Sequence, residues 1–395
     1  MKNEIIDLVK REAKNLLPEV IGIRRHLHAH PELSFEEKAT SEYIANQLSA
    51  LNIPFTTGWA GYGIVAEIRG ASSKTLALRA DMDALPIQEE SNIPYKSTNY
   101  GIMHACGHDV HMASLLGTAN LLKRFQEHLY CTVKLIFQPG EEKLPGGART
   151  MIEEGVLTNP VPLGIFGQHV FPDLECGKVG ICSGLYMASA DEIYIEVIGK
   201  GGHAATPHLN TDVILAASQM LISMQQIVSR NTNPLTPCVL SFGKINSAGG
   251  ATNVMPSAVH IEGTFRTLDE SWRYKAHEQI RNICDAIAHA CGVEVIVYIE
   301  RGYPSLKNDP EMFDWFSSAA ESYLGHENVV LIPQRMASED FAFYSQEIPS
   351  VFYRLGTGAK DGTKRHSVHT PLFDVDENAL EIGIGLMAYL AITAK

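Results

Sequence analysis

The chain alternates between short apolar runs and longer amphipathic segments, and this alternation restricts its fold more than any other feature. Short runs of the kind that form buried strands occupy 63–70, 75–81, 132–142 and 164–170. Patterns with helical spacing occupy 3–17, 37–51, 109–125 and 377–393, and a polar link with three histidines lies between the first two. Strands that alternate with helices favour an α/β layer built on a parallel or mixed sheet.

The pattern changes in the middle of the chain. Strand-like and helix-like segments follow one another there at 192–199, 211–230, 238–245, 257–268, 270–290 and 293–300. Their order is βαββαβ, which is typical of a ferredoxin-like unit. We therefore predict an α/β, mixed-sheet catalytic and metal-binding domain made of 1–186 and 302–395, interrupted by an inserted α+β domain at 187–301.

Composition excludes several classes of protein. The net charge of −13 lacks the basic footprint of a nucleic-acid binder. No run reaches the roughly 18 apolar residues of a membrane span, and the charged N-terminal segment lacks the apolar stretch of a secretory signal. The seven cysteines are odd in number and form no CxxC pair, which argues against a disulfide framework. We expect a cytoplasmic protein with no nucleic-acid partner and no membrane partner.

Thiol, imidazole and carboxyl side chains follow several of the predicted strands or precede a helix. They are Asp81, Asp83, Cys106, His108, His111, Glu141, Glu142, His169 and His369. In open α/β sheets, ligands bind beyond the carboxyl ends of the strands, where residues far apart in sequence converge. Each of these residues taken alone has an ordinary structural interpretation, such as a buried thiol or a solvated carboxylate. Their joint placement favours a metal hydrolase.

The residue types indicate which ions could bind. Cys, His and Glu side chains suit zinc, and also manganese, nickel or cobalt. Five candidate ligands exceed the three protein ligands of a usual catalytic zinc and predict two ions: Cys106, His108, Glu142, His169 and His369. Two ions polarise a carbonyl and supply hydroxide near neutral pH. The neighbouring Glu141 could then face the attacking water as general base.

Eight motifs occur in an order that matches a known family. They are HLHAHPELSFEE, LRADMDALPI, MHACGHDVHMA, IFQPGEE, GGHAATPH, ATNVMPSAVHIEGTFRT, SEDFAFY and VHTPLFD. From about residue 20 to its end, the chain resembles the amidohydrolase branch of the zinc aminoacylase and peptidase superfamily. That branch includes hippurate hydrolases, N-acetyldiaminopimelate deacetylases and plant auxin-conjugate hydrolases.

The resemblance assigns roles to matching residues. It implies a binuclear centre held by Cys106, His108, Glu142, His169 and His369, with Glu141 as base and Asp83 supporting the metal site. It implies that His203 reaches the active site of a neighbouring subunit and steadies the developing oxyanion, and that Asn253 and Arg266 contact substrate. The inserted domain would act as a lid and mediate homodimerisation.

The sequence departs from the family in two places. It has QPGEE where many relatives have QPAEE, and it lacks the Phe that relatives often place before the Asn of ATNVMP. The second change points to an altered substrate pocket rather than altered chemistry.

The resulting prediction is a metal-dependent amidohydrolase. It would carry two divalent ions per subunit (zinc, manganese, nickel or cobalt) and cleave N-acyl amino acids, such as hippurate or N-acetyl conjugates, by attack of a metal-bound hydroxide. Three alternatives stay open: a dipeptidase or carboxypeptidase on the same scaffold, a non-catalytic metal- or ligand-binding protein, and a thiol hydrolase with Cys106 as nucleophile.

Overall fold

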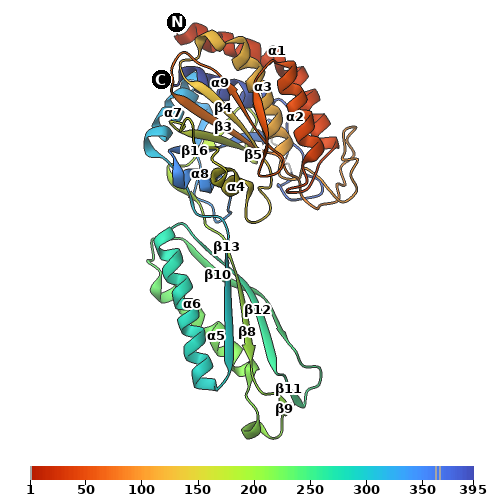
Figure 1. The fold of residues 1–395 in the computed structure, drawn as a ribbon, viewed down its shortest axis with the longest axis vertical. Coiled ribbons are helices and arrows are strands. Elements are labelled where there is room, and N and C mark those ends of the chain that lie inside the picture. Colours follow the sequence, from red (N-terminus) through yellow and green to blue (C-terminus); the bar gives the residue numbers. More distant parts are fainter. Residues whose placement is uncertain (1, 361–362, 364–365) are drawn as a thin grey trace. The chain divides into compact units, whose positions relative to one another are not determined.

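A computed structural model describes residues 2–360, 363 and 366–395, with the side chains of 2 and 3 left out. The chain divides into two compact units (Figure 1). Unit 1 comprises Met1–Gly184, Lys307–Pro333 and Asp340–Lys395, and unit 2 comprises Leu185–Leu306 and Gln334–Glu339. Two short strands lie where the chain passes from one unit to the other, β7 (Gly184–Met187) and β14 (Leu306–Asn308).

Unit 1 is built on an eight-stranded mixed sheet, which confirms the predicted mixed α/β architecture. In spatial order its strands are β1 (Phe55–Trp59), β2 (Gly63–Ile68), β4 (Thr132–Gln138), β3 (Thr75–Asp81), β5 (Ile165–Glu175), β16 (Ser350–Gly358), β6 (Val179–Ile181) and β15 (Val329–Leu331). The four adjacent strands β4, β3, β5 and β16 run parallel, so their carboxyl ends meet at one edge of the sheet.

Helices contact the sheet and one another. They are α1 (Lys2–Ala29), α2 (Lys38–Ala50), α3 (His108–Arg124), α4 (Gly147–Glu153), α7 (Pro310–Leu324), α8 (Ala342–Glu347) and α9 (Ala379–Thr393), with short 3₁₀ turns η1 (Gln126–His128) and η4 (His326–Asn328). Helices α1, α3 and α9 pack against each other, α3 also contacts β3, and α9 contacts β16. Helices α4 and α8 pack together beside β4 and β16.

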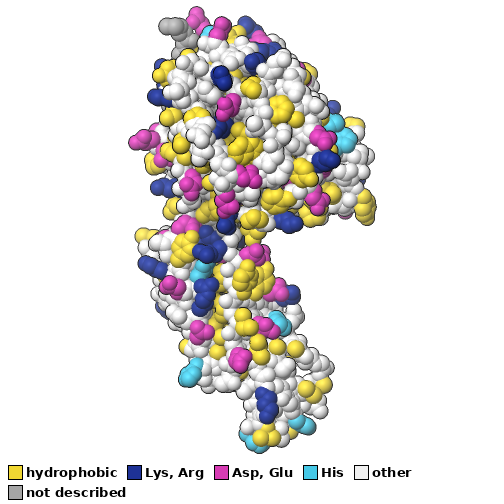
Figure 2. All heavy atoms as spheres, in the orientation of Figure 1, with side chains coloured by type: hydrophobic (Ala, Val, Ile, Leu, Met, Phe, Trp, Pro, Cys, Tyr) yellow, Lys and Arg dark blue, Asp and Glu magenta, His cyan; other side chains and the backbone are white. Residues whose placement is uncertain are grey.

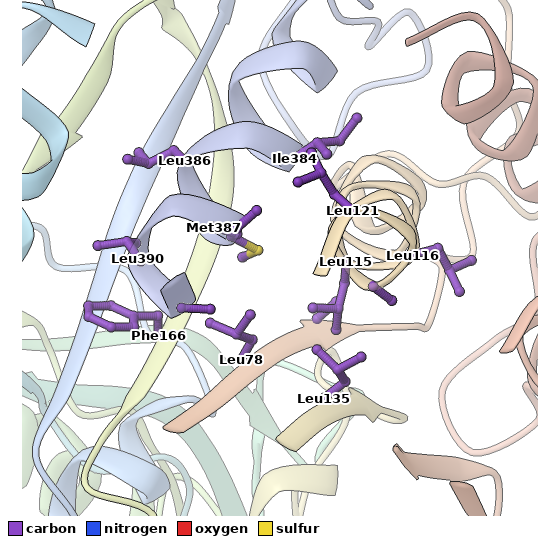
Figure 3. Close-up of a cluster of buried hydrophobic side chains, with 14 of the residues drawn as sticks. Leu78, Leu115, Leu116, Leu121, Leu135, Phe166, Ile384, Leu386, Met387 and Leu390 are labelled. Atoms are coloured by element: carbon purple, nitrogen blue, oxygen red, sulfur yellow. The ribbon is translucent and has the colours of Figure 1, made fainter. Parts of the chain in front are cut away.

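The core of unit 1 lies between α3, α9 and the sheet. Leu115 of α3 points toward the sheet, where Leu78 of β3 and Leu135 of β4 lie (Figure 3). All three side chains are fully buried. Gly117 lets α3 and α9 approach closely, since a Cβ at this position would meet Ile384 at 2.8 Å.

One predicted boundary near the N-terminus is wrong. The helix expected at 3–17 and the polar link after it form a single helix, α1, of 28 residues that includes Pro18. Buried residues recur every three or four positions along it, from Val9 through Val20 to Leu27. Pro18 lies on the exposed side, where water can satisfy the carbonyl that loses its helical partner. The apolar face therefore carries the helix past the proline.

Unit 2 has the element order β8 (Asp191–Ile198), α5 (Val213–Gln226), β10 (Cys238–Ser247), β12 (Ala258–Thr267), α6 (Glu270–Cys291) and β13 (Glu294–Arg301). Its sheet has the order β10-β12-β8-β13, with every neighbouring pair antiparallel. Inward-facing side chains such as Ile193, Ile195 and Val197 form a separate hydrophobic core with α5 and α6. The unit also contains a two-stranded ribbon of β9 (Gly202–His203) and β11 (Val254–Met255), a 3₁₀ turn η2 (Pro207–Leu209) and a π-helical turn η3 (Ile227–Asn231).

Acidic and basic side chains are interspersed over the face of each unit shown in Figure 2. Among the residues that the structure describes, no helix combines the length and the apolar character needed to cross a membrane.

We expect Leu115→Ala to lower the free energy of unfolding by about 2–5 kcal/mol, because it removes packed atoms from a fully buried position and leaves a cavity. Urea denaturation followed by circular dichroism measures the change. Leu331→Ala is the matched control, since Leu331 is 75% exposed and should lose little. Equal losses in the two variants would contradict the proposed core.

Candidate metal centre and active site

The candidate residues lie at the carboxyl edge of the parallel strands of unit 1. Asp81 is the last residue of β3, and Glu141 and Glu142 follow β4 by a few residues. His169 lies inside β5, and not after that strand as the sequence pattern suggested. Because β3, β4 and β5 are neighbours with the same direction, these side chains come from equivalent positions on the sheet.

A tight loop brings two further candidates to this edge. Cys106 precedes Gly107, and His108 is the first residue of α3. Gly107 has φ +81°, and a Cβ there would meet a methyl group of Val170 at 2.5 Å. Only glycine combines this left-handed backbone with the close approach. The loop thus turns Cys106 and His108 toward the end of β5.

Cys106 lies at the centre of one group of side chains. Its Sγ is 3.3 Å from Nε2 of His169 and 3.3 Å from Nε2 of His369. The same nitrogen of His369 is 3.2 Å from Oε1 of Glu142. The His369 backbone N–H donates to the Ala105 carbonyl at 2.8 Å, which ties the segment before α9 to the loop. Four sequence-distant segments therefore bring a thiol, two imidazoles and a carboxylate together.

His108 belongs to a second, adjoining group. Its Nδ1 lies 2.8 Å from the Asp83 carbonyl oxygen, which fixes Nδ1 as a donor, so that the neutral ring presents its lone pair at Nε2. Nε2 is 4.0 Å from Oε2 of Glu141. Candidate ligand atoms of His108, Glu141 and Glu142 all lie within 4.8 Å of one another, as do those of Cys106, His108 and His169.

Asp83 supports this arrangement from behind. Its Oδ2 accepts hydrogen bonds from Ser34 Oγ at 2.6 Å and from the Glu142 backbone N–H at 2.9 Å. Although burial alone would raise its pKa, hydrogen bonding with His108 helps to hold the pKa of Asp83 below its usual value. Asp83 therefore stays ionised while it fixes the backbone that carries Glu142.

Burial and charge shift two other groups strongly. Burial lowers the pKa of the His108 imidazole, but the carboxylates of Asp81 and Asp83 outweigh it and raise that pKa to about 10. Burial, together with the carboxylates of Glu142 and Glu141, raises the pKa of the Cys106 thiol well above its usual value. The field at this edge is strongly negative and attracts a cation.

The donor set fits divalent metal ions. Among the residues that the structure describes, thirteen buried side-chain atoms have no hydrogen-bond partner, and two of them, His108 Nε2 and Glu142 Oε1, belong to proposed ligands at this site. Such orphaned atoms are rare in native proteins and call for an explanation. Thiolate, imidazole and carboxylate are the ligands of zinc and similar ions. Bound cations would satisfy these atoms and balance the negative field.

Sequence reasoning did not find all of the supporting residues. His111, one of the nine candidates, supports the site: its Nδ1–H donates to Asp81 Oδ1 at 2.6 Å, and its Nε2 accepts from the Val170 N–H at 2.9 Å. Glu37 was missed; its Oε1 accepts from the Gly140 N–H at 2.8 Å, and burial together with Asp83 raises its pKa to about 7. The sequence did hold a signal for these supporting residues, because Asp81 lies in the motif LRADMD and Glu37 lies in the motif ELSFEE.

The remaining predicted residues belong to unit 2. His203 is exposed on β9, and its backbone pairs with Val254 of β11, next to Asn253. Its Nδ1 accepts a hydrogen bond from the Ala205 N–H at 3.1 Å. Arg266 lies on β12, where its Nη1 donates to the Met336 carbonyl at 3.1 Å. His203 and Asn253 thus lie together on one ribbon.

A mixed β-sheet with thiol, imidazole and carboxylate donors gathered at its carboxyl edge is typical of a metal-binding hydrolase. The profile of Peptidase family M20/M25/M40 matches residues 77–393, and the chain belongs to this family.

Three relatives illustrate the family match. An N-acetyl-L-cysteine deacetylase of Bacillus subtilis (strain 168) is 42% identical over 364 residues, which cover 92% of this chain and 85% of the relative. The IAA-amino acid hydrolase ILR1-like 4 of Arabidopsis thaliana is 39% identical over 376 residues, covering 94% and 84%. The crystal structure of a dinuclear metal-binding M20 peptidase from Bacillus subtilis has a TM-score of 0.83 at 37% identity, covering 96% and 98%. The protein is therefore an enzyme that acts on amide bonds, as predicted.

Because Cys106 is buried and its pKa is raised, we expect its thiol to react slowly with iodoacetamide in metal-free protein. The half-buried Cys291 and Cys238 should be alkylated before Cys106. Mass spectrometry of tryptic peptides over time measures the order, and Cys291→Ser confirms the assignment of that peptide. Fastest labelling at Cys106 would favour the thiol-hydrolase alternative instead.

Proposed function

We propose that the protein is a metal-dependent amidohydrolase that cleaves N-acyl amino acids. The observation that carries the proposal is the cluster of His108, Glu141 and Glu142, whose candidate ligand atoms lie within 4.8 Å of one another and place a carboxylate base beside metal-type donors. The printed names of two relatives, a deacetylase of N-acetyl-L-cysteine and a hydrolase of IAA-amino acids, support this substrate class.

We propose the five sequence-predicted ligands as the holders of two divalent ions: Cys106, His108, Glu142, His169 and His369. The dinuclear M20 relative supports two ions rather than one. When bound, such ions polarise the scissile carbonyl and make a water molecule acidic. The choice among zinc, manganese, nickel and cobalt depends on the availability of each metal as well as on the type and geometry of these ligands.

The protein's own residues supply the proton transfers. Glu141 accepts a proton from the attacking water and delivers it to the leaving amine nitrogen. Asp83 stays ionised, orients His108 and holds the backbone of Glu142. On the motif match, we assign His203 to stabilisation of the developing oxyanion, and Asn253 and Arg266 to substrate binding. A guanidinium can grip the carboxylate of an amino acid with two parallel hydrogen bonds.

We expect Glu141→Gln to lower kcat by about 10²–10⁴-fold, because the amide keeps the shape but cannot accept the proton. Metal content by plasma mass spectrometry should stay at the wild-type value. Cys106→Ala is the matched comparison, since it removes a proposed ligand and should lower the metal content. The assays use N-acetyl, N-benzoyl and indole-acyl amino acids.

Free dipeptides assayed in parallel separate this proposal from a dipeptidase or carboxypeptidase. Faster turnover of free dipeptides than of every N-acyl amino acid would contradict the proposed substrate class. Full metal content with no turnover of either class would favour a binding protein. Wild-type rates in Glu141→Gln would remove Glu141 as the base.

We further propose that two copies associate through unit 2, which is the family's inserted lid and dimerisation domain by resemblance. Support comes from α5, where Ile214, Leu215 and Ile222 are 46%, 52% and 75% exposed. Three large apolar side chains on one helix are a candidate protein contact surface.

Ile222→Asp places a charge on this surface and should shift the protein from dimer to monomer, because burying an unpaired carboxylate is strongly unfavourable. Analytical ultracentrifugation measures the change in mass. Leu331→Asp, at an equally exposed site in unit 1, is the control and should stay dimeric. A wild-type protein that sediments as a monomer would contradict the proposed association.

A further inference from the structure

Unit 1 contains a buried guanidinium, that of Arg79, whose partner Asp340 contacts Glu141. Arg79 of β3 is fully buried, and its three nitrogens donate to three different side chains. Nε donates to Gln138 Oε1 at 2.9 Å, Nη1 to Asp81 Oδ2 at 2.6 Å and Nη2 to Asp340 Oδ1 at 2.7 Å. Because the guanidinium is a planar fork, it fixes the directions of its partners as well as their charges.

Asp340 is held from more than one element. Besides the bond from Arg79, its Oδ2 accepts from Gln138 Nε2 at 2.7 Å and from the Ala148 N–H at 3.0 Å. These donors belong to β3, β4 and α4. Asp340 is fully buried, and both of its carboxylate oxygens accept hydrogen bonds. Its side chain is therefore fixed in position and already satisfied without an ion.

The backbone of Asp340 connects this network to the base. Its N–H donates to Oε1 of Glu141 at 3.4 Å, a long hydrogen bond of the kind that can tighten when substrate binds. The other oxygen of Glu141 is the one that lies 4.0 Å from His108 Nε2. Oε1 of Glu141 thus accepts from the backbone of Asp340, while Oε2 faces the proposed metal ligand His108.

We propose that Asp340, anchored by Arg79 and Gln138, is a positioning residue that orients the carboxylate of Glu141. This inference rests on the proposed function, in which Glu141 is the general base. The motif SEDF, which contains Asp340, had no assigned chemistry in the sequence. Asp340 acts through Glu141, because its own side chain is engaged with Arg79, Gln138 and Ala148.

Unit 2 provides a buried ion pair of similar construction for comparison. Asp191 accepts from Arg273 Nε at 2.9 Å and from Nη2 at 2.5 Å, and it lies 2.7 Å from His277 Nε2. Asp191 is as deeply buried as Asp340. Loss of its charge tests what removal of a buried ion pair does by itself.

The experiment compares Asp340→Asn with Asp191→Asn in the full-length, metal-loaded enzyme. The amide at 340 places an NH₂ group against donors that now meet a carboxylate, so the segment and its backbone N–H should shift. A displacement of this kind away from the reacting atoms should lower kcat by about 10–100-fold, with KM and metal content close to wild type. Asp191→Asn should lower the thermal unfolding midpoint and leave kcat within about twofold, because the side-chain partners of Asp191, Arg273 and His277, belong to unit 2, whereas Glu141 belongs to unit 1.

A second variant keeps every charge in place. Gln138→Met removes the hydrogen bonds from Gln138 to Asp340 but retains the ion pair between Arg79 and Asp340. We expect a smaller loss of kcat, roughly three- to tenfold, from the same displacement. A kcat within twofold of wild type in both variants would overturn the positioning role, as would equal losses in Asp340→Asn and Asp191→Asn.

Crystal structures of wild type and Asp340→Asn separate the two proposals. A wild type that hydrolyses no N-acyl amino acid ends the proposed function, but the position of the Glu141 carboxylate can still be compared. Displacement of Glu141 from the backbone N–H of residue 340 supports the inference. An unmoved Glu141 carboxylate overturns it, whatever the activity.

Discussion

Three carboxylates lie buried near one edge of the central sheet, and the site depends on how their charge is balanced. Asp81, Asp83 and Asp340 have almost no exposed surface. An unpaired buried charge is costly, so each of them needs a partner inside the protein. Arg79 serves two of them, and His111 completes the hydrogen bonding of Asp81. Buried ligand atoms that have no hydrogen-bond partner after these carboxylates are paired, such as Nε2 of His108, are available to bind a cation.

Hydrogen bonds to the backbone also fix the tautomers of two imidazoles. His108 and His169 each direct Nδ1 to a backbone carbonyl oxygen, at 2.8 Å in both cases. In the neutral form of each ring, Nε2 therefore carries the lone pair that a metal needs. The backbone carbonyls come from residues that follow β3 or lie in β5, so the sheet itself sets the ring orientations. The site is organised by the fold before any ion binds.

The sequence indicated where reactive side chains would gather but not how they pair. Apolar runs locate the ends of β3 and β4, and those ends place Asp81 and Glu141 near each other. No local pattern reveals that Arg79 bonds Asp340, which lies 261 residues further along the chain. Helix α1 was predicted too short for a related reason: the polar residues after position 23 read as a link, whereas contacts with distant elements bury His28 among them.

In the proposed function, the chemistry and the substrate contacts belong to different parts of this chain. The proposed base and the proposed metal ligands lie beside buried ion pairs of unit 1, so we expect substitutions there to disturb charge balance as well as catalysis. The proposed substrate contacts, Asn253 and Arg266, lie on exposed or half-buried positions of unit 2. In an apolar pocket, one extra or missing methylene changes the preference between two similar substrates by only about 10–200-fold. The missing Phe before Asn253 can therefore alter substrate choice while the buried network and the reaction stay the same.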